Sequence, residues 1–280
     1  MTRQSYKTDL NDGQWELIEP LLPRSKSETG RGRKRTVDYR EIVNAVLYWS
    51  RSGCPWELLP HDFPHHKTVA AHSRRSSSYD DWQCLRIARY FRSWQKKGVW
   101  HRIHNELRIK VRLGEGRSDI ATAAIIDSQS VKTTEIGGSE RGFDGGKKIK
   151  GRKRHLLVDT MGLVILVIVH AANIADVTAS RMLLAETNLS QTNIQQIWAD
   201  QGDRGAKLQR VANGCQLNLE VVKRQSKQFE ILPRRWVVER TFAWIGKQRR
   251  LSKDYERLPA VSETAVYIAM IPLMLNRLTA

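Results

Sequence analysis

The chain has 280 residues, 40% of them hydrophobic and nine of them tryptophan, which excludes a disordered protein and leaves room for one large domain or two smaller ones. Its 47 lysines and arginines exceed its 29 aspartates and glutamates, for a formal net charge of +18. This excess indicates a polyanionic partner, either nucleic acid or an anionic membrane surface.

The apolar residues and the cysteines favour a cytoplasmic protein. No uninterrupted apolar run is long enough to span a bilayer, and the first residues lack the apolar segment of a signal peptide. Cys54, Cys84 and Cys215 form no CxxC pair, which is typical of a reducing compartment. Residues 1–120 hold 23 lysines and arginines against 14 acids, and residues 121–280 hold 24 against 15. We therefore expect both halves to face the same polyanion.

The first part of the chain, residues 1–112, is predicted to be all-helical and basic. The spacing of apolar residues predicts helices over residues 10–22, 37–53, 54–64, 66–75 and 81–100. Gly53 is in position to cap the second of these helices. The helices between residues 54 and 77 are compatible with a helix-turn-helix, which would present basic side chains to a DNA major groove. These side chains are Lys67, Arg74 and Arg75.

A linker rich in glycine and charge is predicted over residues 113–120, and a second domain over residues 121–280. Apolar runs predict strands over residues 123–128, 154–160, 163–171, 194–200 and 217–223. Helices are predicted over residues 176–186, 204–212 and 233–249. This order predicts an α/β domain in which helices cover the faces of a mixed sheet.

Three acidic residues stand where the chemistry of such a sheet collects. Asp127 and Asp200 close the first and fourth predicted strands, and Glu239 lies on the last predicted helix. If the first and fourth strands pair, their aspartates become neighbours. Three carboxylates suit a pair of Mg²⁺ ions that catalyse phosphodiester chemistry. The alternative is that each aspartate merely ends a strand in contact with water.

The second domain resembles the DDE transposases of bacterial insertion sequences, in the group called insertion sequence four/five. The resemblance rests on the segments IIDSQSVKT, RGFDGGKKIKGRKRHLLVDTMGL, IWADQGDRG, VVKRQ and LPRRWVVERTFAWIGKQRRLSKDYERLP. In the first domain, GCPWELLPHDFP and FRSWQKKGVWHRI resemble the helical DNA-binding region of the same family. The resemblance covers nearly the whole chain. It implies an RNase H-like mixed-sheet catalytic domain preceded by an all-helical DNA-binding domain.

The resemblance also implies a catalytic site. Asp127, Asp200 and Glu239 match the three acids of the family and would be both catalytic residues and ligands of a two-metal Mg²⁺ site, in which Mn²⁺ can substitute. Arg235 matches the arginine of the family's Tyr-Arg-Glu-Lys pattern, and Lys247 approximates its lysine. The pattern's tyrosine position holds Leu232.

Two positions depart from the family pattern. The Asp-Gly-Gly-Tyr motif expected after the fourth strand is Asp200-Gln201-Gly202-Asp203 here. Residues 65–81 form an apparent insertion. The three matched acids are intact.

The function implied by the resemblance is transposition. Such a protein binds the ends of an insertion element and catalyses metal-dependent cleavage and transfer of DNA strands. Its partners would be double-stranded DNA, as element ends and as target, and further copies of itself on that DNA, in the nucleoid and without a membrane partner. Two alternatives remain: a catalytically inactive repressor derived from a transposase, and an RNase H-like nuclease that cleaves without joining.

Basic residues near the three acids are predicted to contact DNA phosphates. Residues 147–155 hold six lysines and arginines in nine positions; the alternative is a hairpin that simply faces water. In the second domain the predicted DNA contacts are Lys147, Lys148, Lys150, Arg152, Lys153, Arg154, Arg235, Lys247, Arg249 and Arg250. Asp159 also follows an apolar run, and we predict a hairpin-turn residue without a metal contact. Trp236, Phe242 and Trp244 are predicted to lie in the core rather than stack on bases.

Overall fold

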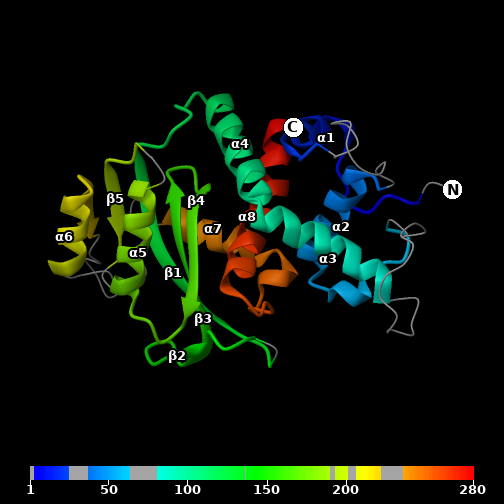
Figure 1. Ribbon diagram of the computed structural model, residues 1–280. Helices are drawn as coiled ribbons and strands as arrows, with labels where there is room; N and C mark the ends of the chain where they lie inside the picture. The colour runs from blue at the N-terminus through cyan, green and yellow to red at the C-terminus, as the bar shows by residue number, and fades with distance from the viewer. Residues whose placement is uncertain are drawn as a thin grey trace.

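The computed structural model contains a mixed sheet with helices on both faces and a group of helices beside it (Figure 1). It describes residues 3–24, 37–63, 81–135, 137–189, 193–200, 206–221 and 236–280. None of the helices in these ranges is long and apolar enough to cross a membrane.

The regular elements described before the predicted linker are all helices. They are α1 (Asp12–Ile18), η1 (Glu19–Leu21), α2 (Tyr39–Ser52), η2 (Trp56–Leu58), α3 (Asp81–Lys96) and α4 (Val99–Gly114). The single helix predicted over residues 81–100 is two helices, because Gly98 adopts a left-handed conformation with φ of 65° between them. The predicted helix over residues 66–75, with its three basic side chains, lies outside the described residues.

Helix α2 shows how local sequence sets its own limits. The Asp38 side chain accepts a hydrogen bond from the Arg40 backbone N–H at 2.8 Å, which caps the first turn. At the other end Gly53 takes the left-handed conformation, with φ of 74°, and its N–H donates to the Trp49 carbonyl. The prediction of this helix and of its glycine cap is confirmed.

The sheet has six strands in the described part of the chain. They are β1 (Ala123–Lys132), β2 (Gly142–Asp144), β3 (Ile149–Asp159), β4 (Val164–Ala171), β5 (Gln196–Ala199) and β6 (Asn218–Val221). The order is β2-β3-β1-β5-β6, with β4 also paired to β3. Strands β1 to β4 pair antiparallel, whereas β1–β5 and β5–β6 pair parallel. All five predicted strands are present, and the three-residue β2 was not predicted.

The helices of the second part are α5 (Asp176–Leu189), α6 (Ala206–Gly214), α7 (Trp236–Gly246) and α8 (Pro259–Leu278), with the short η4 (Arg249–Leu251) after α7. Helix α8 was not predicted. Its buried residues follow one another almost without interruption from Ser262 to Ile271, so it lacks the one-sided apolar stripe by which surface helices are recognised.

Two hydrophobic cores lie on the two faces of the sheet. One, here called the α5 core, joins Ala124, Ile126 and Leu157 to α5 and α6. The other, the α8 core, joins Ile125, Leu156 and Trp198 to α7, α8 and the N-terminal helices. Alternate residues of β1 therefore belong to opposite cores.

The α8 core extends across the predicted linker. Trp49 of α2 and Leu107 of α4 belong to it, as do Val266 and Met270 of α8. Helices α4 and α8 lie side by side along this core (Figure 1). The N-terminal helices and the sheet thus bury apolar surface against the same C-terminal helix.

Candidate active site and nucleic-acid interface

Asp127 lies within β1, and Asp200 directly follows β5, the parallel strand paired with β1. The prediction that Asp127 closes its strand is wrong, because β1 continues through polar residues as far as Lys132 while it pairs with β3. Strand β1 pairs with β5 in a register that matches Ile125 to Trp198. Asp127 lies two positions after Ile125, and Asp200 lies two positions after Trp198, just beyond the end of β5. Continuing the register by two positions would bring them opposite one another. The sequence predicted that the two aspartates would be neighbours if the first and fourth predicted strands paired. These strands, β1 and β5, do pair.

Both aspartates are on the side of the sheet that α7 covers. Ile125 and Trp198 belong to the α8 core, and side chains two positions apart on a strand share a face. Asp127 also stands opposite Leu156 of β3, another member of that core. Its Oδ1 accepts a hydrogen bond from the Ser128 backbone N–H at 2.7 Å.

Glu239 belongs to α7, the helix that covers this side of the sheet. Val237 and Val238 on the same helix are buried in the α8 core, and the helix packs against β1 and β3. Glu239 itself is exposed, in the first turn of the helix. The fold thus places all three predicted acids on one side of the sheet.

The described residues contain no group of three or more His, Cys, Asp or Glu side chains arranged to hold a metal ion. Residues 201–205 and 222–235, next to Asp200 and α7 in the sequence, are outside the described ranges. The donor chemistry on this side of the sheet nevertheless suits a hard cation, because carboxylate oxygens are the ligands that Mg²⁺ takes from proteins.

This mixed sheet, with Asp127 within β1, Asp200 directly after β5 and Glu239 on the covering helix α7, has the arrangement of an RNase H-like domain. Residues 120–274 match the family model described as "Transposase DDE domain", and residues 10–86 match the one described as "Putative transposase of IS4/5 family". The chain belongs to the DDE transposases of the IS4/5 type, whose partner is DNA.

A curated relative agrees with this family. The chain is 31% identical over 132 residues to the "Insertion element IS402 uncharacterized 16.2 kDa protein" of Burkholderia cepacia. The match covers 47% of this chain and 78% of that protein. DDE transposase domains in general use divalent metal ions.

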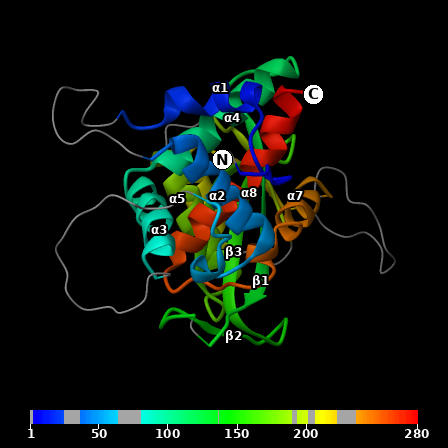
Figure 2. The ribbon, with the colours of Figure 1, turned by 90° about the vertical axis from the view of Figure 1, so that its right-hand side faces the viewer.

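The basic run of residues 147–155 is divided between surface and interior. Lys147, Lys148 and Lys150 are exposed and lie in the hairpin by which β2 leads into β3. Strand β2 is at the lower end of the molecule in Figures 1 and 2. A pocket of about 400 Å³ lies there. The residues that line it are Lys132, Thr133, Thr134, Glu135, Arg141, Phe143, Lys148 and Lys150. This end of the sheet offers cations to an anionic partner.

The prediction that Arg152, Lys153 and Arg154 contact DNA is wrong for this fold. Their exposed fractions are 0%, 6% and 1%, because both faces of β3 are covered. The Lys153 ammonium group lies 3.0 Å from Asp176 and 3.6 Å from Asp144. A side chain paired in this way has no surface to offer to a phosphate.

The two arginines instead hold the segment after α7 against the sheet. The Arg152 guanidinium donates to the carbonyl oxygens of Glu256 and Arg257, each at 2.8 Å. That of Arg154 donates to the carbonyl oxygens of Leu251 at 2.7 Å and Lys253 at 3.0 Å. Burial lowers the pKa of Arg154 to about 10, so this arginine stays charged at neutral pH.

Beyond α7 the predicted basic face is also divided. Lys247 and Arg249 are exposed. Arg250 is buried, with its Nε 2.7 Å from a Glu256 carboxylate oxygen and its guanidinium 4.8 Å from the Trp49 ring. The prediction that Arg250 contacts DNA is therefore wrong. Arg235, Lys67, Arg74 and Arg75 lie outside the described residues.

Asp159 is a hairpin residue, as predicted, and it also forms a buried ion pair. It ends β3, is fully buried, and lies 2.7 Å from an Arg112 nitrogen of α4. Its other oxygen accepts backbone N–H groups of Met161 and Leu163, each at 2.9 Å. Asp159, which was not predicted to bind metal, thus joins the sheet to the N-terminal helices.

Trp236 was predicted to lie in the core, but its side chain is at the surface. Its exposed fraction is 43%, and the Arg240 guanidinium lies 4.4 Å from its ring and 4.7 Å from that of Trp244. Phe242 and Trp244 are partly buried against the α8 core. An exposed tryptophan backed by an arginine therefore stands one helical turn before Glu239.

Proposed function

We propose that this protein binds the ends of its insertion element and catalyses metal-dependent cleavage and transfer of DNA strands. The observation that carries this proposal is the parallel pairing of β1, which contains Asp127, with β5, which Asp200 directly follows, beneath the helix α7 that carries Glu239. Family membership supports the same reaction class.

Asp127, Asp200 and Glu239 are the residues that would hold Mg²⁺, or Mn²⁺ in its place. When bound, such ions activate an attacking oxygen and stabilise the leaving oxygen of a phosphodiester. Cleavage is the attack of water on the phosphorus at the element end, which breaks the bond to the 3′ oxygen. The freed 3′-hydroxyl then attacks a phosphodiester of the target and displaces a new 3′ oxygen. Both steps are in-line phosphoryl transfers, so one set of carboxylates can serve both.

The chain's own basic residues would hold the DNA while this happens. Lys147, Lys148 and Lys150 at one end of the sheet and Lys247 and Arg249 after α7 are exposed and would contact phosphates, which positions a duplex without reading its sequence. The N-terminal helices would recognise the element ends. Two copies would assemble on DNA in the nucleoid, because an element has two ends to be cut and joined.

Single substitutions of the three acids test the proposal. Asp127→Ala, Asp200→Ala and Glu239→Gln should each abolish nicking and strand transfer on an end-containing duplex with Mg²⁺. Affinity for that duplex should stay the same or rise slightly, since a negative charge near the phosphates is lost. Glu220→Gln, which removes an acid from β6 instead, is the control and should remain active.

The rivals give different results in this assay. A nuclease would nick but never join strands. A repressor would bind the duplex without Mg²⁺-dependent cleavage in the unsubstituted protein. Full activity of any one of the three acid variants would remove that residue from the proposed site.

A further inference from the structure

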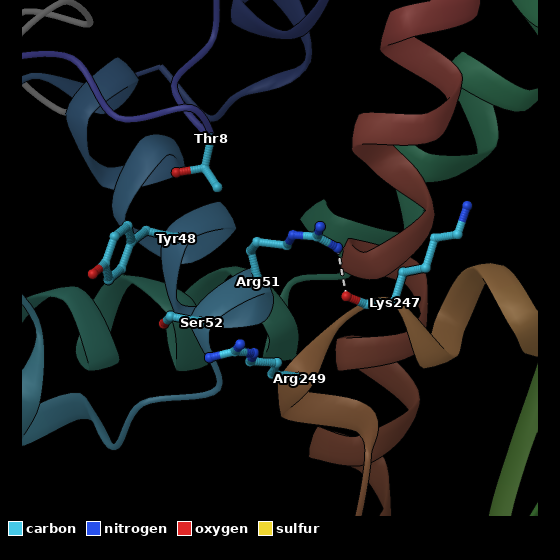
Figure 3. Close-up of a pocket in the computed structure, with 6 residues that line it drawn as sticks. All are labelled: Thr8, Tyr48, Arg51, Ser52, Lys247 and Arg249. Carbon is cyan, nitrogen blue, oxygen red and sulfur yellow. Dashed lines mark hydrogen bonds between the residues drawn. The ribbon is translucent and has the colours of Figure 1, made fainter.

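The end of α2 and the segment that follows α7 enclose a basic pocket (Figure 3). Its volume is about 280 Å³. The residues that line it are Thr8, Tyr48, Arg51, Ser52, Lys247 and Arg249. Three are cationic, three carry hydroxyl groups, and none of these six is a carboxylate. Such a lining favours an anion that accepts several hydrogen bonds.

The nearest acid in the sequence is already neutralised by a partner of its own. Asp9 follows Thr8, and its carboxylate oxygen lies 2.7 Å from an Arg3 nitrogen. Arg3 is also paired with Glu41 at 2.7 Å. Within the described part of the chain no carboxylate forms an ion pair with Arg51 or Arg249, so the positive potential of the pocket is left uncompensated there.

The walls of the pocket are held in place by backbone contacts. The Arg51 guanidinium donates to the Lys247 carbonyl oxygen, while the Lys247 side chain extends away from Arg51 (Figure 3). Gly53, at the end of α2, lies so close to η4 that a Cβ there would stand 3.0 Å from the Arg249 carbonyl carbon. An arginine has five N–H donors, so Arg51 keeps donors for a ligand after binding this carbonyl.

One hydroxyl group at the pocket makes no hydrogen bond within the protein. The Thr8 hydroxyl oxygen is buried and has no hydrogen-bond partner in the structure. Burying a hydroxyl without a partner costs free energy. A ligand oxygen in the pocket would supply the missing partner.

We propose that this pocket binds a backbone phosphate of the DNA duplex, held by Arg51, Arg249 and the Thr8 hydroxyl. The inference rests on the proposed function, because it takes DNA as the substrate. A phosphodiester has one negative charge and acceptor oxygens that suit the arginine fork. In this arrangement one phosphate contacts both the N-terminal part of the chain and the segment directly after α7, the helix of Glu239.

The experiment measures duplex affinity as a function of salt for four single variants. Arg249→Gln and Arg51→Gln should each weaken binding about tenfold and lower the slope of log affinity against log salt by about 0.9. Arg210→Gln is the matched control, because Arg210 is exposed on α6 at the opposite end of the molecule (Figure 1). Thr8→Val should weaken binding while leaving the unfolding temperature of the free protein unchanged or higher.

Each outcome decides one question. If Arg249→Gln and Arg210→Gln lose the same affinity, or if Thr8→Val binds as well as the unsubstituted protein, the pocket is not a DNA site. If inorganic phosphate raises the unfolding temperature of the unsubstituted protein more than chloride at equal ionic strength does, and Arg249→Gln removes this effect without changing duplex affinity, the pocket takes a free anion, which overturns the proposal. Failure of the unsubstituted protein to bind any duplex would instead reject the proposed function.

Discussion

Arg152 and Arg154 show that burial decides what a basic residue does. Both belong to a run that looks like a phosphate-binding surface in the sequence, yet their guanidinium groups donate to backbone carbonyl oxygens of a segment about a hundred residues later in the chain. An arginine is well suited to this role because its donors form a fixed planar fork. Charge density in a sequence therefore overstates the number of DNA contacts.

Asp159 allows a direct test of a buried ion pair. Asp159→Asn keeps the shape of the side chain but leaves the Arg112 guanidinium, 2.7 Å away, buried without a counter-charge. Loss of one partner of a buried pair typically costs about 3 kcal/mol or more, so the free energy of unfolding in urea should fall by about that amount.

Glu115→Gln is the control for this experiment, because Glu115 is an exposed acid at the end of the same helix as Arg112. Equal stability of the two variants would show that the pair is not needed. Asp159→Ala is also a poor negative control in a cleavage assay, because lost activity could follow from lost stability alone.

His155 predicts a pH dependence of stability. Burial and the neighbouring His170 lower the pKa of His155 to about 3, whereas the unfolded side chain has its usual pKa near 6.5. Between these values the unfolded state binds the extra proton. The contribution of His155 is therefore present above about pH 6.5 and is lost as the pH falls toward 3, by up to about 1.4 kcal/mol per pH unit.

The substitution His155→Leu removes this proton linkage. The free energy of unfolding should fall more steeply for the unsubstituted protein than for the variant as the pH is lowered from about 7 to about 5, measured by urea denaturation. The buffers must keep one ionic strength, because Lys153 and Asp176 lie beside the ring. Parallel curves for the two proteins would contradict the prediction.

At the scale of elements, two glycines end helical segments in the same backbone conformation but in different surroundings. Gly53 after α2 and Gly98 before α4 have φ of 74° and 65°. A Cβ at Gly98 would meet nothing within 4 Å, whereas one at Gly53 would stand 3.0 Å from the backbone of Arg249. They therefore separate the cost of a left-handed conformation from the cost of crowding.

Alanine at each position measures these two costs. Gly98→Ala should lower the free energy of unfolding by about 1 kcal/mol, the cost of a left-handed alanine. Gly53→Ala should cost clearly more, because η4 must also move away from α2. Chemical denaturation of both variants measures these losses. An equal loss of stability would mean that η4 can move away from α2 without a cost in free energy.

Helix α7 combines an apolar side and a polar one within a few residues. Val237 and Val238 are buried and set how the helix lies on the sheet, while Trp236 and Glu239 remain exposed. The aliphatic residues of this helix therefore pack against the sheet, whereas Trp236 and Glu239 lie at the surface. Aromatic character alone could not distinguish these roles.

At the scale of the whole molecule, the N-terminal helices and the sheet are joined through α8. Apolar residues from α2, α4 and α8 form one core, and Arg112 of α4 is paired with Asp159 of β3. Apolar burial of this extent is the main stabilising contribution in a protein of this size. Removing one part therefore exposes surface of the other.

A truncated protein tests this arrangement. The fragment of residues 113–280 keeps the sheet but loses the helices that cover α8, so it should be unfolded or aggregated, with strong binding of a hydrophobic dye. Size-exclusion chromatography and near-ultraviolet circular dichroism, with the full chain as the reference, provide the measurement. A monomeric fragment with the native near-ultraviolet spectrum would show that the two parts fold independently.

Features that depend on neighbouring residues in the sequence could be predicted from it. The five longer strands, α2 with its cap at Gly53, and the position of Asp200 at the end of β5 follow from apolar periodicity and turn chemistry, which act over a few residues. The end of β1 was misplaced, because its second half is polar and is held in the sheet by pairing with β3. The family motifs are likewise read directly from the chain. Helix α8 was missed because it is buried on most of its surface and lacks that periodicity.

Only the tertiary structure decided which side chains meet. The pairing of β1 with β5 brings Asp127 and Asp200, 73 positions apart in the chain, to neighbouring strands. The basic run was divided because β3 is covered on both faces, so Arg152 is buried while Lys150 is exposed. The pocket between α2 and η4 joins residues about two hundred positions apart. Burial and pairing are set by elements distant in the sequence, and local pattern carries no information about them.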